Sequence, residues 1–338
     1  SSIRRNTRSL VPSRGLGDVY KRQVNKRGIS KTALTSPTEV PARWVSKFGS
    51  VTFNQYGREF PTGGMNEEGL VVEQMWLEET KYPARDERPA LTELTWIQYQ
   101  LDECKTVDEV IATDSKLRIM ETGAPLHFLI CDRTGQAAVI EFIDGNMAVR
   151  AAEELPYRAL TNSTYERSLS YLKSRKRFGD EKVIVDDSTE SLARFVRAVS
   201  GIERYTAGEQ GDAISQAFKI LEEVSLDEIT RWSIVYDVKN LVVQFKTGKS
   251  PKIKRLNLKD FDFNCSTPSR VLDIDCDVTG DVHARFIDYT TEVNKKLIYN
   301  SWKNTAWLKD TPDDVLNMVA SYPDRFTPVV EEEEQHKH

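Results

Sequence analysis

The sequence has 338 residues, of which 39% are hydrophobic and 29% are charged, as in a globular protein long enough for one large domain or two smaller ones. The net charge is −5 and its acidic and basic residues are interleaved, which argues against a face for nucleic acid or an anionic membrane. No apolar run reaches the roughly 18 residues of a membrane-spanning helix, so we predict none. These properties favour a small-molecule partner.

The first 23 residues differ from the rest, because their arginines are scattered among Ser, Gly and Asn without periodicity. They lack the apolar centre of a secretory signal and the amphipathic pattern of a transit peptide. The stretch 17–23, GDVYKRQ, resembles the in-frame translation of a transposase end used in sequencing libraries. We therefore predict that residues 1–23 are a non-native or disordered leader, and that the folded domain begins at Val24.

The next part of the chain has the patterns of strands and then of helices. Apolar residues at 43–54 and 70–77 predict two strands, and the Gly- and Pro-rich stretch between them is predicted to be a loop. Between Thr92 and Thr113 apolar residues recur at helical spacing, with a break near Thr106 where a new helix can start. Two successive helices are expected there.

The middle of the chain returns to strands and then to helices. Asp-Gly at 144–145 between apolar runs is a strong hairpin signal, and the run from Ser163 to Glu166 is predicted to be a capping box. The elements predicted in this part are strands at 127–131, 138–143 and 147–150, a short strand ending at Leu160, helices at 163–172, 190–202 and 212–224, and a hairpin over 232–245 that turns at 237–240.

Hairpins and helix pairs are segregated along the chain, which favours an α+β fold with two sheets stacked between two helical layers over an alternating βαβ fold. From Cys265 the composition becomes more polar, and residues 282–316 have helical stretches. We therefore predict a main domain over residues 24–264 and an appended helical segment with a polar tail over residues 265–338.

Common catalytic motifs are absent from the sequence, among them phosphate loops, dinucleotide fingerprints and the serine-hydrolase and zinc-protease signatures. The four cysteines form no CxxC pair, so we expect no metal site, and pairing of Cys265 with Cys276 stays open. A single strand histidine such as His127 is more often a hydrogen-bonded core residue than a base or a ligand. Cys131 is interpreted as a small buried hydrophobic residue, not as a nucleophile.

Five segments together resemble the choloylglycine hydrolase family, which includes bile salt hydrolases and penicillin V acylases. They are 44–51 (WVSKFGSV), 64–70 (GMNEEGL), 125–128 (PLHF), 160–163 (LTNS) and 193–197 (ARFVR). Their order and spacing are similar to the family's from about Val24 to Phe263. The resemblance implies the four-layer αββα sandwich of N-terminal-nucleophile hydrolases, hydrolysis of a small-molecule linear amide without a cofactor, and a homotetramer as in many relatives.

The resemblance also assigns roles to three residues. Asn162 matches the family asparagine that donates to the oxyanion, and Arg194 matches the arginine beside the nucleophilic sulfur. Trp76 stands where the family has its second oxyanion donor, which here would be a backbone N–H. The structural alternatives are that Asn162 is a turn residue, that Arg194 is a solvated helix arginine off the apolar stripe, and that Trp76 is a core aromatic.

The family's N-terminal cysteine, and the arginine and aspartate that flank it, have no counterpart in the match. We therefore predict an N-terminally truncated amidase that is inactive as written. The alternative is a catalytically dead acyl-group binding module. Conjugated bile acids, penicillin V and acyl-homoserine lactones all remain open as substrates, and the sequence predicts no cellular location.

Overall fold

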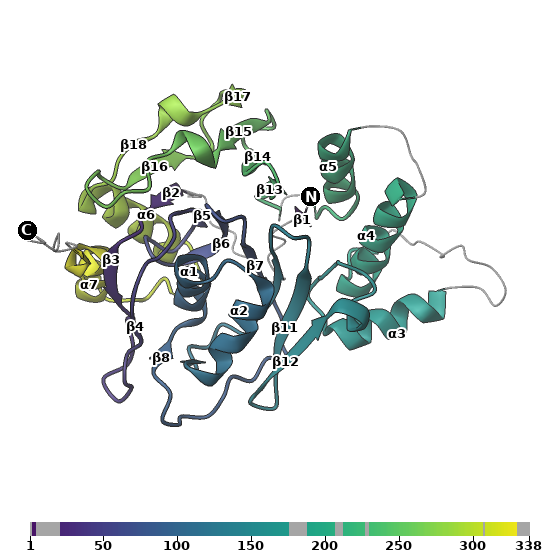
Figure 1. Cartoon of the computed structure of the whole chain (residues 1–338), viewed down its shortest axis with the longest axis horizontal. Coiled ribbons are helices and arrows are strands. Elements are labelled where there is room, and N and C mark those ends of the chain that lie inside the picture. The colour runs from purple at the N-terminus through teal and green to yellow at the C-terminus, as the bar shows by residue number, and fades with distance from the viewer. Residues whose placement is uncertain are drawn as a thin grey trace, which may run out of the picture.

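Two β-sheets form the centre of the computed structural model, which describes residues 2–4, 21–175, 188–206, 212–226, 230–306 and 308–329 (Figure 1). Within these ranges the larger sheet has the order β12-β11-β10-β7-β6-β5-β2-β16-β18 and the smaller has the order β1-β13-β14-β15-β17. All strand pairs of the larger sheet are antiparallel. This arrangement confirms the predicted α+β class.

The strands of the larger sheet are β2 (Lys21–Asn25), β5 (Ser50–Asn54), β6 (Pro61–Asn66), β7 (Val71–Trp76), β10 (Leu126–Cys131), β11 (Ala137–Ile143), β12 (Asn146–Ala151), β16 (Arg270–Asp273) and β18 (Ile287–Asp288). Those of the smaller sheet are β1 (Ser2–Arg4), β13 (Trp232–Asp237), β14 (Val242–Thr247), β15 (Lys254–Asn257) and β17 (Gly280–Asp281). The described helices are α1 (Glu93–Glu103), α2 (Val107–Ala112), α3 (Tyr165–Arg175), α4 (Ser191–Thr206), α5 (Ala213–Glu223), α6 (Thr291–Lys303) and α7 (Asp313–Ser321).

Side chains of β10 alternate between two cores, as the period of a strand requires. Phe128 faces α1, where its ring lies 4.5 Å from that of Trp96. Leu129 and Cys131 face the opposite way, into the core that the two sheets share with α3 and α4. The interpretation of Cys131 as a buried apolar residue is therefore confirmed.

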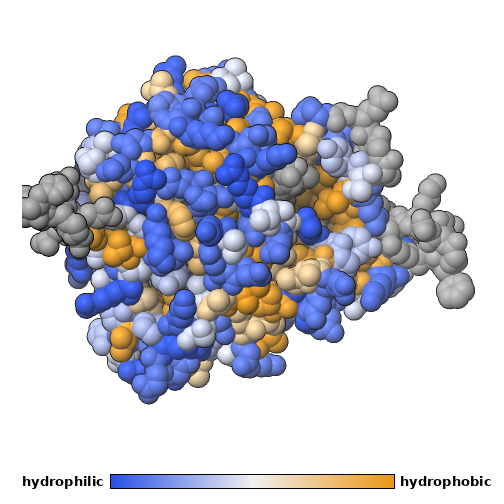
Figure 2. Space-filling view, in the orientation of Figure 1, coloured by the Kyte–Doolittle hydropathy of each residue, from blue (hydrophilic) through white to orange (hydrophobic). Residues whose placement is uncertain are grey.

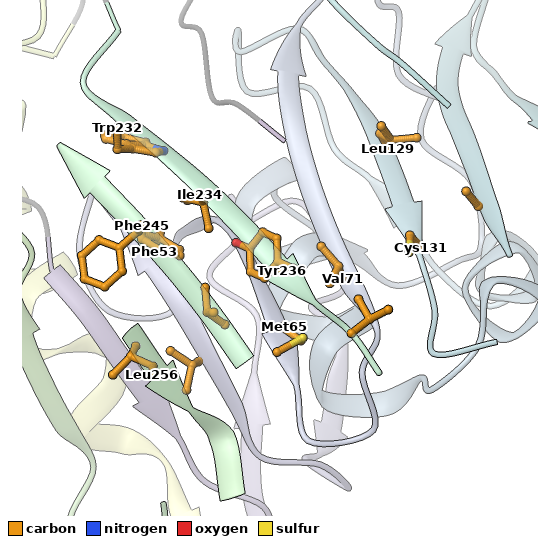
Figure 3. Packing of buried hydrophobic residues seen from close by; sticks show 14 of the residues in the cluster. Phe53, Met65, Val71, Leu129, Cys131, Trp232, Ile234, Tyr236, Phe245 and Leu256 are labelled. Atoms are coloured by element: carbon orange, nitrogen blue, oxygen red, sulfur yellow. The ribbon is translucent and has the colours of Figure 1, made fainter. Parts of the chain in front are cut away.

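The core between the sheets is built from aromatic residues of both. Tyr236 of β13 and Phe245 of β14 meet Phe53 of β5 edge to face, with ring centroids 6.5 and 5.8 Å apart. Figure 3 shows these side chains converging between the two sheets. On the far side of the smaller sheet, Phe218 of α5 packs against Val235. The layers are thus helix, sheet, sheet and helix.

Strand β6 corrects the prediction of a loop between residues 54 and 70. Its glycines look like loop residues in sequence, but they permit close packing in the sheet. A Cβ atom on Gly63 would lie 2.3 Å from Oε1 of Glu73, and one on Gly64 would lie 2.7 Å from the Val51 carbonyl oxygen. Glycine is therefore required here by space, not by turn geometry.

The predicted short strand ending at Leu160 is also wrong, because residues 155–164 form neither helix nor strand. Their backbone is held by the side chain of Tyr165. Its hydroxyl donates to the Tyr157 carbonyl at 2.8 Å and accepts from the Tyr157 N–H at 3.2 Å. An irregular segment of this kind has no periodic signal in sequence.

Two strands lie at least partly before the predicted domain start, since β1 pairs with β13 and β2 begins at Lys21. Gln23 of β2 pairs with Thr52 of β5 and with Val271 of β16. Arg22 of the same strand is fully buried, with its guanidinium carbon 3.7 and 3.9 Å from the ring centroids of Phe53 and Phe245. Residues 5–20 lie outside the described residues, and the assignment of a non-native leader stays a prediction.

The segment after residue 265 adds strands to the larger sheet, to the smaller sheet and to a separate three-stranded sheet. β16 extends the larger sheet, while β19 (Thr327–Pro328) pairs with β3 (Ile29–Thr32), which in turn pairs with β4 (Arg43–Val45). Helices α6 and α7 pack against each other and around Phe60. The remaining short pair, β8 (Ala90–Leu91) and β9 (Arg118–Ile119), lies parallel. The helical prediction is confirmed, and the domain boundary itself stays a prediction.

A buried ionic cluster joins β3 to α1 beneath this C-terminal segment. Nζ of Lys31 lies 2.7 Å from Glu59 and 2.9 Å from Asp102, and all three side chains are at most 2% exposed. Trp44 Nε1 and Gln98 Nε2 each donate to Asp102 at 2.8 Å. The lysine thus bridges two buried carboxylates, and Nε of Arg58 lies a further 3.3 Å from Oε1 of Glu59.

Hydrophilic residues cover most of the face seen in Figure 2, with hydrophobic residues scattered among them, as is ordinary for a globular surface. In the described ranges, no helix is both long enough and apolar enough to cross a membrane.

Candidate active site

Asn162 lies in the irregular segment between β12 and α3, three residues before the helix begins at Tyr165. The helix is capped by Thr164, whose Oγ1 accepts from the Arg167 N–H at 3.3 Å. The predicted cap at Ser163 is wrong, because the Ser163 hydroxyl donates instead to Ser191 at 2.9 Å. Asn162 therefore stands at a strand-to-helix connection that is fixed on both sides.

The side-chain amide of Asn162 connects the three residues predicted for the site. Nδ2 donates to the Trp76 carbonyl oxygen at 2.9 Å, and Oδ1 accepts from Nη2 of Arg194 at 2.8 Å. A carbonyl only accepts and a guanidinium only donates, so the network fixes which way the amide points. Each amide nitrogen carries two hydrogens, and one of those on Asn162 is used by Trp76.

Arg194 is only 4% exposed, although it lies off the apolar stripe of α4. Burial, with a smaller contribution from the nearby charge of Arg197, lowers its pKa to about 10. It still carries its charge at neutral pH. Its Nε donates to the Thr189 carbonyl at 3.2 Å. The alternative of a solvated helix arginine is therefore wrong for Arg194.

Trp76 ends β7, opposite Leu126 of β10. Its indole is half-buried against the core under α1, and Nε1 donates to Glu78 at 2.8 Å. Its contact with Asn162 is made by the carbonyl oxygen. The core-packing alternative therefore describes the side chain, and the predicted donor role of the Trp76 N–H stays a prediction.

His127 is buried and hydrogen-bonded, as the structural interpretation predicted. Its Nε2 lies 2.7 Å from the Thr161 carbonyl oxygen and its Nδ1 lies 3.1 Å from Oε1 of Glu141. Sequence reasoning missed Glu141, although the turn predicted at 132–135 sets the register of the two strands and so its position opposite His127. The β10–β11 register pairs Phe128 with Ile140, and one further step sets Glu141 opposite His127.

Ser191 was also missed. At the first turn of α4 it donates to Oγ1 of Thr161 at 3.0 Å and accepts from Ser163. The helix that carries Arg194 is thereby tied to both residues that flank Asn162. No short-range sequence pattern predicts contacts between segments about 30 residues apart.

The four cysteines are free in the structure. Cys104 and Cys131 are buried, and burial raises the pKa of the Cys104 thiol to about 12, which disfavours the thiolate that attacks carbonyls. Burial also raises the pKa of Cys276. In the ranges the structure covers, no group of three or more His, Cys, Asp or Glu side chains is placed to hold a metal ion.

Comparison with known proteins finds similarity to penicillin V acylases and to a conjugated bile acid hydrolase. The chain is 28% identical to the penicillin V acylase of Pectobacterium atrosepticum over 261 residues, which are 65% of this chain and 69% of that protein. The structure of a penicillin V acylase from Agrobacterium tumefaciens superimposes with a TM-score of 0.72 at 26% identity, covering 81% of this chain and 91% of that one.

A variant of the conjugated bile acid hydrolase of Clostridium perfringens has a TM-score of 0.64 at 15% identity, over 79% of this chain and 94% of that one. This likeness shows a shared fold and confirms the predicted N-terminal-nucleophile hydrolase sandwich. Residues 50–271 match the family described as linear amide C-N hydrolases, choloylglycine hydrolase family. The chain belongs to that family.

Proposed function

We propose that this protein recognises and hydrolyses linear amides of acylated small molecules at the site formed by Trp76, Asn162 and Arg194. The observation that carries the proposal is the orientation of the Asn162 amide, fixed by the Trp76 carbonyl and the buried Arg194 guanidinium. A donor that is oriented before the substrate arrives needs no reorganisation when negative charge develops.

The chemistry assigned to this site is acyl transfer to a cysteine. The thiolate forms a bond to the amide carbon, and the carbonyl oxygen becomes an oxyanion that the second N–H of Asn162 would stabilise. Collapse of this intermediate breaks the C–N bond, and the amine leaves with a proton from the nucleophile's own α-amino group. Such a group titrates near pH 8, about 7.7 to 8.0. Water then hydrolyses the thioester.

This mechanism needs a cysteine with a free α-amino group, and the four cysteines of the sequence are internal. We therefore propose that cleavage depends on an N-terminal cysteine that is none of these four. The charge of Arg194 would favour the thiolate form of such a cysteine. The alternative function, an acyl-group binding module, is supported by the same combination of an ordered site and internal cysteines.

The substrate is proposed from the relatives' names and from the resemblance in sequence. Both penicillin V acylases are more similar in sequence to this chain than the bile acid hydrolase, so penicillin V is the first substrate to test. Conjugated bile acids and acyl-homoserine lactones share the linear amide and complete the panel.

The test measures both binding and turnover of the three substrate classes. The 338-residue chain is compared with a chain extended by the segment that precedes Val24 in the source gene. Binding by both chains with turnover only by the extended chain is expected. In the extended chain, Asn162→Ala should lower kcat by about 10²- to 10³-fold, as loss of one oxyanion donor does. Robust cleavage by the 338-residue chain would contradict the missing nucleophile, and binding without turnover in both chains would favour the binding module.

A further inference from the structure

A buried histidine–glutamate pair lies directly behind the Asn162 segment. His127 is 0% exposed and Glu141 is 5% exposed, and both face the core that contains Leu129 and Val139. They come from adjacent strands, β10 and β11. Neither residue belongs to the reaction centre proposed above, so the burial of two ionisable side chains here requires another explanation.

The contacts of the imidazole fix where hydrogens must be. The Thr161 carbonyl can only accept, so Nε2 of His127 carries a hydrogen and donates it over 2.7 Å. Nδ1 faces Oε1 of Glu141 at 3.1 Å, and two lone pairs cannot face each other at that distance without a proton between them. The pair therefore holds one shared proton and is neutral as a unit, as imidazolium with carboxylate or as imidazole with carboxylic acid.

Oε1 of Glu141 makes a second hydrogen bond. Oε1 of Glu141 also accepts the backbone N–H of Tyr165, the first residue of α3, at 2.9 Å. Thr161 and Tyr165 lie on either side of Asn162. The His127–Glu141 pair thus makes hydrogen bonds to the backbone on both sides of Asn162, the residue proposed to donate to the oxyanion.

We propose that His127 and Glu141 are positioning residues, whose hydrogen bonds to the backbone of Thr161 and Tyr165 set the orientation of the Asn162 amide. The inference rests on the proposed function of Asn162, and neither residue touches the substrate. Without the pair, the Thr161 carbonyl and the Tyr165 N–H would lose these hydrogen bonds, while the hydroxyl contacts to Ser191 and the hydrogen bonds of Asn162 would remain.

Two variants of Glu141 separate this role from simple packing. In Glu141→Gln the amide oxygen can accept from Tyr165, while the amide N–H₂ donates to Nδ1 of a neutral His127 that still donates to Thr161. Because Oε1 of Glu141 makes both contacts in the wild type, the amide must rotate slightly to make each of them, and the shared proton is lost. Glu141→Leu keeps the approximate volume and removes both contacts.

The experiment is ¹⁵N NMR of the histidine rings and of the Asn162 side-chain amide in the full chain. The sequence has four histidines, so His127→Gln identifies the His127 signals, and Asn162→Asp identifies the amide. We expect an exchange-protected Nε2–H on His127, an Asn162 amide that is the same in the wild type and Glu141→Gln, and a shifted one in Glu141→Leu. Penicillin V should bind about tenfold more weakly to Glu141→Leu and nearly normally to Glu141→Gln.

A wild-type ring without hydrogen on Nε2 would overturn the proposal, and this measurement needs no variant. An unchanged Asn162 amide in Glu141→Leu would overturn it too. If that variant does not fold, His127→Gln takes its place, because one amide group cannot contact Thr161 and Glu141 as two ring nitrogens do. Failure of the wild type to bind any amide would reject the proposed function, whereas the NMR result would still decide the positioning role.

Discussion

The buried guanidinium of Arg194 donates to Oδ1 of Asn162 at 2.8 Å, and so joins helix α4 to the segment before α3. Arg194→Met should weaken the binding of penicillin V by roughly ten- to a hundredfold, because a hydrogen bond from a charged group contributes about 1.5–3 kcal/mol. The free energy of unfolding should change less, since loss of the bond is offset by relief of the desolvation that lowers the Arg194 pKa to about 10.

Calorimetric titration with penicillin V measures the affinity of the wild type, of Arg194→Met and of a control variant. Arg197→Met is the matched control, because Arg197 lies on the same helix and donates instead to the Glu223 and Ser188 carbonyls. Equal affinity in Arg194→Met and the wild type would remove Arg194 from the site.

Lys31 supplies the positive charge of the buried cluster with Glu59 and Asp102. Lys31→Met should lower the free energy of unfolding by about 3–5 kcal/mol, because it removes the cation between Asp102 and Glu59 and leaves only Arg58, 3.3 Å from Glu59. Denaturant unfolding measures the change. Lys47→Met is the control, since Lys47 pairs with Glu103 but is 62% exposed, and its loss should cost about 1 kcal/mol or less. Similar losses in both variants would show that the cluster contributes little.

Arg22 and Glu73 are buried charged residues of neighbouring core positions, and the carboxylate of Glu73 offsets part of the cost of burying Arg22. No hydrogen-bond acceptor for the Arg22 guanidinium lies among the described residues, and its pKa is lowered by burial and raised less by Tyr236 and Glu73. The double variant Arg22→Met/Glu73→Gln should be more stable than the wild type by about 1–4 kcal/mol, as when buried ions are replaced by neutral groups.

A double-mutant cycle by thermal unfolding separates these contributions. Glu73→Gln alone should destabilise the protein, because the charge of Arg22 then has less compensation. Additive effects of the two single changes would indicate that the two charges do not interact.

Glu93 begins α1 with its side chain 7% exposed and accepts a short hydrogen bond from the Thr122 hydroxyl. Burial raises its pKa from 4.5 to about 7. A carboxyl whose pKa is raised by folding stabilises the protein in its protonated form, so its contribution is present below about pH 4.5 and is lost as the pH rises through 7.

Glu93→Gln should therefore match the wild type near pH 4.5 and exceed it by up to about 3 kcal/mol above pH 7. Chemical unfolding across this pH range measures the difference. Glu87→Gln, a change at an exposed carboxylate that does not act on Glu93, should leave the pH profile unaltered. A difference between Glu93→Gln and the wild type that is constant with pH would contradict the raised pKa.

Helices and strands whose apolar residues recur at regular spacing were predictable, because burial of one face imposes that spacing on the sequence. The helix pair of α1 and α2 and the hairpin of β13 and β14 lie within a few residues of their predicted places. β6 was missed, because its glycines serve close packing and carry no alternation. The segment before α3 was misread as a strand, because side-chain contacts from Tyr165 and Ser191 hold its backbone.

The site was predictable only in part, and for a different reason. Asn162, Arg194 and Trp76 were indicated by resemblance, and no local pattern joins residues from β7, the 155–164 segment and α4. Their roles in catalysis stay predictions. Glu141 was within reach of sequence reasoning, since a hairpin register is set by its turn. The burial of Arg194 was not predictable, because the apolar stripe of a helix does not show which of its polar residues are covered by other segments of the chain.

The close approach of Glu73 to Gly63 has a consequence for how the family's sequences can vary. The carboxylate of Glu73 occupies the space that any side chain on residue 63 would need, with Oε1 only 2.3 Å from such a Cβ. A larger residue at 63 therefore requires the carboxylate end of Glu73 to move or a shorter residue at 73. Among relatives, these two positions on neighbouring strands should be inherited as a pair, with covariation across the sheet where neither position alone need be conserved.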